Sequence, residues 1–177
     1  MFRAALTISL PLIFSSQLIF AQANPANNII ADLDAREPAI SALSDQLWDL
    51  AELGYLEQKS SALLQETLRK EGFAIQAGVA EIPTAFIASY GSGEPVIAIM
   101  GEFDALPGIS QAATPTQQAI EGKHSAQACG HNLFGAGSAA AAIAVKDWLA
   151  RSTHQGTIRL YGTPAEEGGS GKVYLVR

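Results

Sequence analysis

The sequence predicts an α/β fold built around a parallel βαβ unit, and three features support this prediction. Residues 95–100 (PVIAIM) form a short apolar run of the kind that suits a strand buried on both faces of a parallel sheet. An alanine-rich stretch over about 132–150, with Asn132 as its cap, has high helix propensity. Residues 157–161 (TIRLY) then predict a second strand. Strand, helix and strand in this order predict parallel strands joined by a right-handed crossover.

The residues ahead of this unit begin with an expected amphipathic helix. After a polar lead-in at 24–28, aliphatic residues recur at three- and four-residue steps: Ile40, Leu43, Leu47, Leu50 and Leu53. Pro38 fits the start of this helix or a kink in it, because proline lacks the N–H that a helix interior uses. Gly54 fits its end.

A second helix is predicted over 60–71. Ser60 or Ser61 can cap it, and Gly72 stands where a left-handed terminator is expected. Two strand-like runs follow this helix, at 73–77 (FAIQA) and 84–90 (TAFIASY).

The first 23 residues have the layout of a signal peptide. Arg3 is their only charge, residues 4–20 are mostly apolar, and residues 21–23 (AQA) give the small-x-small pattern of a cleavage site. An uncleaved membrane anchor is the alternative, but polar residues interrupt an apolar run that is shorter than the roughly 20 residues of a spanning helix. We therefore expect residues 1–23 to be removed on export, and the protein to be periplasmic or secreted.

The composition fits one packed domain and argues against nucleic acid as a partner. The 177 residues are 48% hydrophobic and 16% charged, which allows a core and disfavours disorder. The formal net charge is −6. Binding nucleic acid requires clustered Lys and Arg to replace counterions, so this balance disfavours it. The balance places little restriction on a small-molecule substrate.

Polar clusters interrupt the βαβ unit at three points, one of them within a loop too long for a simple connector. They are Glu102 and Asp104 after the first strand, Cys129 and His131 at the start of the helix, and Glu166 and Glu167 after the second strand. In a βαβ unit the helix begins where the first strand ends, and the parallel second strand ends on the same side. All three clusters are therefore expected at the carboxyl edge of the sheet, where open α/β sheets bind ligands.

These residue types suit a metal site. Cys129 and His131 offer a thiolate and an imidazole to one ion, and a carboxylate completes a ligand set that suits zinc and tolerates other divalent metals. Two adjacent glutamates can divide the work: one binds the metal, and the other takes a proton from water that the metal acidifies. The same carboxylate could then deliver the proton to a departing nitrogen.

Each cluster also has a simpler interpretation. Alone, a Cys-x-His pair occurs by chance at helix starts, and a Glu-Glu pair is usually a solvated turn. Cys129 with His124 or His131 could instead form a thiol nucleophile and its base, but that scheme has no use for the paired glutamates. A serine hydrolase is disfavoured because the G-x-S-x-G turn is absent from the sequence.

Four long blocks in the right order and spacing resemble the M20 peptidase/amidohydrolase family. They are WDLAELGYLEQKS (48–60), IPTAFIASYGSGEPVIAIMGEFDALPGISQ (82–111), ACGHNLFGAG (128–137) and YGTPAEEGGSGK (161–172). The resemblance covers nearly all of 40–177 and is greatest to the amidohydrolase branch. It implies a zinc-peptidase-like catalytic domain with a mostly parallel central sheet, two divalent metal ions, zinc or manganese, and hydrolysis of the amide of N-acyl or N-aroyl amino acids such as p-aminobenzoyl-glutamate.

The resemblance also implies roles for single residues. Cys129, His131 and Glu167 correspond to metal ligands, and Glu166 corresponds to the general base. Asp104 corresponds to the aspartate that orients a ligand. Two further positions stay open: Glu102 stands where other branches have a histidine ligand, and His124 could be a displaced equivalent within the unusual segment 122–127 (GKHSAQ).

The family implies further histidine ligands and an inserted smaller domain, which are not among these 177 residues. We therefore expect residues 24–177 to be the N-terminal portion of the catalytic domain, and to have little activity alone. The inserted domain would form a homodimer or a hetero-oligomer. A broader carboxypeptidase or aminoacylase of the same family, and an inactive truncated remnant or binding module, remain alternatives.

Overall fold

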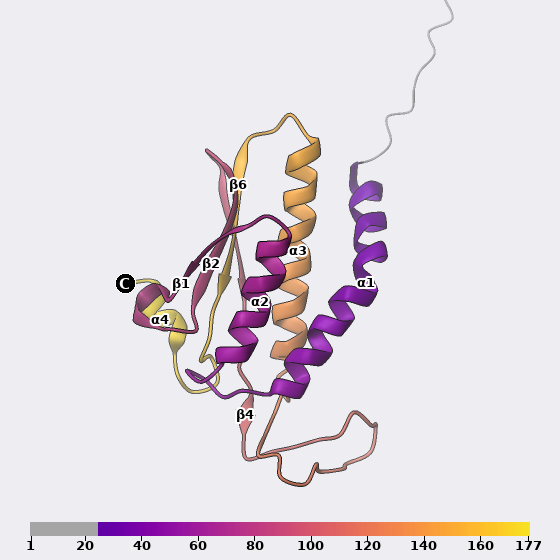
Figure 1. Ribbon diagram of the computed structural model, residues 1–177, viewed down its shortest axis with the longest axis vertical. Coiled ribbons are helices and arrows are strands. Elements are labelled where there is room, and N and C mark those ends of the chain that lie inside the picture. The colour runs from indigo at the N-terminus through magenta and orange to yellow at the C-terminus, as the bar shows by residue number, and fades with distance from the viewer. Residues whose placement is uncertain (1–24) are drawn as a thin grey trace, which may run out of the picture.

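The computed structural model describes residues 25–177, so the predicted signal peptide at 1–23 lies outside the described residues. Two helices come first and a run of short strands follows, before a long helix, a strand and a short helix; the long helices pack beside a small sheet (Figure 1). In chain order the elements are α1 (Pro25–Leu50), α2 (Gln58–Lys70), β1 (Ala74–Ala77), the 3-10 turn η1 (Val79–Glu81), β2 (Phe86–Ser92), β3 (Val96–Gly101), β4 (Leu106–Pro107), β5 (Ser125–Ala126), α3 (His131–Arg151), β6 (Gly156–Gly162) and α4 (Gly171–Leu175).

The sheet has the strand order β1-β2-β6-β3 and is mixed. β3 and β6 pair in parallel, and α3 lies between them in the sequence, which confirms the predicted βαβ unit. β2 pairs antiparallel with both β1 and β6, so the expectation of a mostly parallel sheet is wrong. The reason is the short connection between β2 and β3, which makes these strands run in opposite directions. Because β6 lies between them, it can be parallel to only one.

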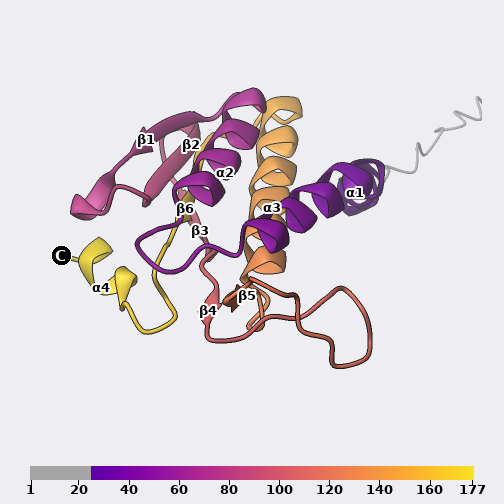
Figure 2. The same cartoon turned by 60° about the horizontal axis from the view of Figure 1, so that its bottom comes forward.

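One face of the sheet is covered by helices (Figure 2). α2 packs on β1 and β2, α3 packs on β3 and β6, and α1 packs on α3. The core between these layers is apolar and includes Leu43, Leu47, Leu64, Leu68, Phe73, Phe86, Phe103, Ile143, Ile158 and Leu160. α3 is long and apolar enough to cross a bilayer by composition, but its packing on the sheet is that of a core helix.

Strand β3 lies at the edge of the sheet, so the expectation that 95–100 is buried on both faces is wrong. Ile97 is 56% exposed, and Val96 and Met100 are also exposed. These side chains are exposed because α3 covers a single face of β3 and no described strand pairs with its outer edge. An apolar run therefore predicted the strand but not its surroundings.

The helix boundaries differ from the expectations mainly at their starts. α1 already begins at Pro25, so the polar lead-in is helical and Pro38 lies inside the helix. Ser60 is within α2 rather than at its cap, and its N–H donates to the Glu52 carboxylate at 2.7 Å. Asn132 is likewise inside α3, whose cap is Gly130. Local capping rules failed here because side chains from other segments bind these groups.

Candidate metal centre

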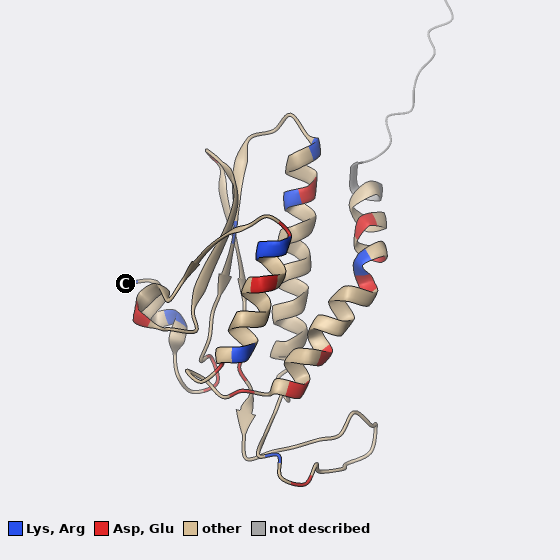
Figure 3. Cartoon of the chain, in the orientation of Figure 1, with Lys and Arg blue, Asp and Glu red and all other residues tan. Residues whose placement is uncertain are grey.

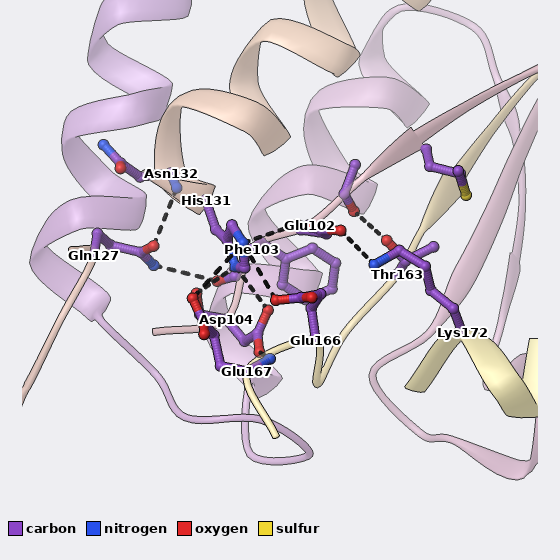
Figure 4. Close-up of polar contacts among 12 residues, drawn as sticks. Glu102, Phe103, Asp104, Gln127, His131, Asn132, Thr163, Glu166, Glu167 and Lys172 are labelled. Carbon is purple, nitrogen blue, oxygen red and sulfur yellow. Dashed lines mark hydrogen bonds and ion pairs between the residues drawn. The ribbon is translucent and has the colours of Figure 1, made fainter. Parts of the chain in front are cut away.

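The three polar clusters meet at the carboxyl edge of the parallel strand pair, as the βαβ geometry predicts. β3 ends at Gly101 and β6 ends at Gly162, and α3 begins at the same end. The Thr163 N–H donates to the Gly101 carbonyl at 2.9 Å and ties the two strand ends together. The loops at this end of the sheet carry much of the acidic charge (Figure 3). Side chains from all three clusters point toward one another there (Figure 4).

The start of α3 is fixed by close packing and by a buried amide. A Cβ on Gly135 would lie only 2.8 Å from the carbonyl oxygen of Glu102, so the helix can approach the strand end only with glycine at this position. The Gln127 side chain accepts the Asn132 N–H at 3.1 Å and donates to the Phe103 carbonyl at 3.3 Å. The loop before the helix is thus fastened to the loop after β3.

His131 lies at the centre of the cluster and is buried. Its Nδ1 is 3.0 Å from Oδ1 of Asp104 and 3.1 Å from the carbonyl oxygen of the same residue. Its Nε2 lies 2.8 Å from Oε2 of Glu102 and 3.8 Å from carboxylate oxygens of both Glu166 and Glu167. A carboxylate on Nδ1 fixes the ring and leaves Nε2 directed at the acidic groups, an arrangement common for metal-bound histidine.

Asp104 organises two of its neighbours at once. The side chain is fully buried, and while one oxygen contacts the imidazole, Oδ2 accepts the Glu167 N–H at 2.8 Å. The loops after β3 and β6 are therefore joined through one carboxylate. The orienting role that the resemblance implied for Asp104 stays a prediction, and it would act through these contacts.

Two groups of side chains could each hold a cation. Within each group the candidate ligand atoms lie within 4.8 Å of one another: Cys129, His131 and Glu167 form one, and Glu102, His131 and Glu166 form the other. Oε1 of Glu167 is buried and has no hydrogen-bond partner within residues 25–177. A buried carboxylate oxygen normally has a partner, so this orphaned atom fits a site built for an added cation. The donor set of thiol, imidazole and carboxylates suits zinc.

The acidic surroundings disfavour a thiolate at Cys129. The pKa of this exposed thiol is raised, first by the nearby Glu167 carboxylate, which favours the protonated form, then by desolvation and by the charges of Glu167, Glu166 and Glu102. A thiol nucleophile needs a lowered pKa, so this environment argues against the cysteine-nucleophile alternative. A divalent cation among these groups would reverse the effect, because a coordinating thiol loses its proton.

His124 is in neither of these groups. Its side chain is exposed, and its carbonyl accepts the Gly108 N–H at 2.8 Å. The structure thus gives His124 no place among the candidate ligands of the described residues.

Sequence reasoning missed two residues of this region. Lys172 of α4 forms an ion pair with Glu102, and the buried Glu57 accepts a hydrogen bond from the backbone just before Glu166. Both lie in blocks that carried the family resemblance, but nothing in their local spacing distinguishes them from solvated surface charges. Their contacts span about 70 and 108 residues, respectively, so only the fold reveals them.

The chain is similar in sequence to known proteins. Residues 98–177 match the sequence profile of Peptidase family M20/M25/M40. Over 146 residues the chain is 45% identical to a subunit of the p-aminobenzoyl-glutamate hydrolase of Escherichia coli, covering 82% of this chain and 30% of that protein. It is 31% identical to the human Xaa-Arg dipeptidase, covering 81% of this chain and 33% of the relative.

A solved structure shares the fold. A dinuclear metal-binding peptidase of the M20 family from Bacillus subtilis superposes with a TM-score of 0.68 and 27% identity, over 81% of this chain and 39% of that one. The chain spans about a third of the length of the curated relatives it matches. The matches to a family profile, to curated relatives and to a solved fold agree with one another, and the chain belongs to peptidase family M20/M25/M40.

Proposed function

We propose that the protein is a metal-dependent amidohydrolase that cleaves the amide of N-acyl or N-aroyl amino acids. One observation carries the proposal: a thiol, an imidazole and several carboxylates converge around a buried Glu167 oxygen that has no partner among the described residues. A surplus of negative groups with an unsatisfied oxygen is costly unless a cation joins it.

The ligands of the proposed metal ions come from this convergence. Cys129, His131 and Glu167 would hold one divalent ion, zinc or manganese. Glu102, whose carboxylate lies 2.8 Å from the same imidazole nitrogen, is where a ligand of a second ion could come from. When bound, such ions would polarise the scissile carbonyl and acidify water. The Bacillus subtilis peptidase of similar fold is dinuclear, which supports a requirement for two ions.

The chain's own residues supply the proton transfers. Glu166 is proposed as the general base: its side chain is 43% exposed, so substrate and water can reach it, and it lies 3.8 Å from the central imidazole. It would take a proton from the attacking water and give it to the departing nitrogen. Asp104 would hold the His131 ring and the Glu167 backbone in place during this transfer.

p-Aminobenzoyl-glutamate is the first substrate to test, because the relative at 45% identity is named for its hydrolysis. The similarity to the human Xaa-Arg dipeptidase favours a second candidate, hydrolysis of dipeptides. Both substrates present an amide whose nitrogen belongs to an amino acid. We also propose that the protein is exported, to the periplasm or the medium, and that it forms a homodimer or a hetero-oligomer.

The test combines metal content with turnover in the full-length natural protein. We expect close to two divalent ions per chain and hydrolysis of p-aminobenzoyl-glutamate, with both lost on chelation and both restored by zinc or manganese. Metal without cleavage of this substrate, but with cleavage of an Xaa-Arg dipeptide, would favour the second candidate. A protein that holds no metal and cleaves neither substrate would be a binding module or remnant, and the proposal would be wrong.

A further inference from the structure

The connector between α1 and α2 contacts both loops that carry the candidate site. The Ala105 N–H donates to the Glu52 carbonyl at 2.9 Å, which fastens the loop after β3. The Tyr55 hydroxyl donates to the Gly169 carbonyl at 2.5 Å, which fastens the loop after β6. The connector therefore lies where it can set the position of one loop against the other.

Glu57 closes this connector and is fully buried, at 0% exposure. Its Oε1 accepts the Ala165 N–H at 2.8 Å, and its Oε2 accepts the Thr84 hydroxyl at 3.0 Å. Burial raises the pKa of its carboxyl. Neither partner is a cation, so ion pairing does not explain why a carboxyl group occupies this place. Its contacts instead suggest a positioning role for the backbone of Ala165.

Ala165 has a backbone conformation that alanine rarely adopts. Its φ is +56°, in the left-handed region that is unfavourable for residues with a Cβ. Such a conformation persists only where the surroundings hold it. Here the buried residue receives Gly171 N–H on its carbonyl at 3.1 Å and gives its own N–H to Glu57. The turn that follows directs Glu166 and Glu167 back toward His131.

Two buried carboxylates thus hold the backbone on either side of Glu166. Glu57 accepts the N–H of Ala165, and Asp104 accepts the N–H of Glu167 at 2.8 Å. Asp104 also touches the imidazole, whereas Glu57 contacts Thr84 and the backbone of Ala165. The two acids therefore differ in role although both receive an amide hydrogen from the same turn.

We propose that Glu57 is a positioning residue, which holds the strained Ala165 turn so that Glu166 and Glu167 face the metal centre. The inference rests on the proposed metal-binding function. In this role Glu57 acts as a hydrogen-bond acceptor for the Ala165 N–H, and its negative charge is not needed. An uncharged acceptor of the same shape should serve, while an apolar residue of similar size should not.

Three variants of the full-length protein separate these requirements. Glu57→Leu fills the space and removes the acceptor. Glu57→Gln keeps an oxygen for the Ala165 N–H and can donate its amide hydrogen to the Thr84 hydroxyl. Thr84→Val is the matched control, since it removes the other partner of the same carboxylate and leaves the Ala165 contact in place.

Two readouts are measured on each variant: hydrogen exchange at the Ala165 and Glu167 amides without metal, and affinity for Co²⁺, whose spectrum reports thiolate coordination. Glu57→Leu should speed exchange at both amides at least about 10-fold and weaken Co²⁺ binding about 10- to 100-fold, the range seen when a residue supporting a ligand is lost. Glu57→Gln and Thr84→Val should stay within about 3-fold of the wild type.

The outcomes distinguish this proposal from the proposed function. If wild type binds no Co²⁺, the metal function fails, while exchange still tests the hold on Ala165. If Glu57→Leu speeds exchange but binds Co²⁺ as wild type does, Glu57 is structural only and the positioning role is overturned. If Glu57→Leu does not fold, the wild type and Glu57→Gln decide. An unprotected Ala165 amide in the wild type, or a large loss of Co²⁺ affinity in folded Glu57→Gln, overturns the positioning role of Glu57.

Discussion

Two clusters of charged residues in this protein are built on opposite plans. At the flank of the helices, two cations and two carboxylates face one another: Arg36 of α1, Glu71 after α2, and Lys146 and Asp147 of α3. At the carboxyl edge of the sheet, four carboxylates surround His131, and among the described residues Lys172 is the cation paired with them. Figure 3 shows mixed signs at the first place and mainly acidic positions at the second.

The flank network is matched in charge and joins three helices. Arg36 contacts Glu71 at 2.7 Å and Asp147 at 3.0 Å, and Lys146 contacts the same two carboxylates at 3.2 and 2.6 Å. Burial alone would raise the pKa of Glu71 and Asp147, but hydrogen bonds from the two cations outweigh it and lower both. Each carboxylate is therefore stabilised in its charged form.

The sheet edge lacks this balance, and the difference indicates what each cluster is for. A network whose charges cancel fastens elements together and needs nothing added. A cluster with surplus carboxylates, and with a buried Glu167 oxygen that lacks a partner among the described residues, fits the proposed metal function, because a bound cation would satisfy it. The comparison predicts that changes at the edge alter metal binding and turnover, whereas changes at the flank alter stability alone.

The largest effect is expected from Glu166→Gln. Removing the proposed base while keeping its shape should lower kcat about 10²- to 10⁴-fold, because general acid–base catalysis contributes that much. Metal content should stay at the wild-type value. Hydrolysis of p-aminobenzoyl-glutamate measures kcat, and elemental analysis of the same samples measures the metal.

Glu121→Gln is the matched control, since Glu121 is an exposed glutamate in the long loop after β4. It should leave kcat unchanged. Retained turnover in Glu166→Gln would remove Glu166 as the base. Loss of one ion along with activity would instead make it a ligand, in the group that it forms with Glu102 and His131.

A smaller effect is expected from Asp104→Asn, which tests whether the edge depends on its buried organiser. Two donors, the imidazole Nδ1 and the Glu167 N–H, face the two oxygens of Asp104. An amide replaces one acceptor with a donor and so cannot satisfy both. We expect metal affinity to fall about 10- to 100-fold, measured by titration with Zn²⁺.

The control for this variant is Asp49→Asn, which makes the same change of charge at an exposed position near the end of α1. If both variants lost affinity equally, overall charge would account for the effect. The orienting role of Asp104 would then be wrong.

The location of the site could be predicted from the sequence because it depends on local order. Strand, helix and strand are each recognisable from their own residues, and parallel pairing then places His131 and Glu166 at one edge regardless of the rest of the chain. The roles of single residues, by contrast, came from the family resemblance and stay predictions; for Asp104 the structure shows the contacts through which such a role would act.

What could not be predicted depends on contacts between distant segments. The antiparallel pairing of β2 with β6 and the exposure of Ile97 follow from how strands assemble, which an apolar run does not encode. Glu57 resembles a surface glutamate before a helix until the fold buries it against Ala165. Arg36 and Asp147 meet across 111 residues, so their pairing is invisible in sequence spacing.

The smallest effect is expected at the flank, from Arg36→Ala. This variant removes two partly buried ion pairs and should lower the free energy of unfolding by about 1 kcal/mol, measured by chemical denaturation at pH 7. Metal affinity should not change. Arg69→Ala, which removes an exposed pair with Glu66 on α2, is the control and should change stability by less than about 0.5 kcal/mol.

The dependence on pH gives this last prediction its sharpest form. Because folding lowers the pKa of Glu71 and Asp147, the unfolded chain takes up protons first as pH falls, so their stabilisation is complete above the ordinary values of 4.5 and 3.8 and is lost below them. The stability difference between wild type and Arg36→Ala should therefore be largest at neutral pH and shrink as pH falls below about 4. The raised pKa of Glu57 acts in the opposite direction, favouring the fold at low pH, but it is common to both proteins and cancels in the difference. A difference that stayed constant into acid would mean that Arg36 stabilises the helices through packing, and the flank would no longer be an electrostatic counterpart of the sheet edge.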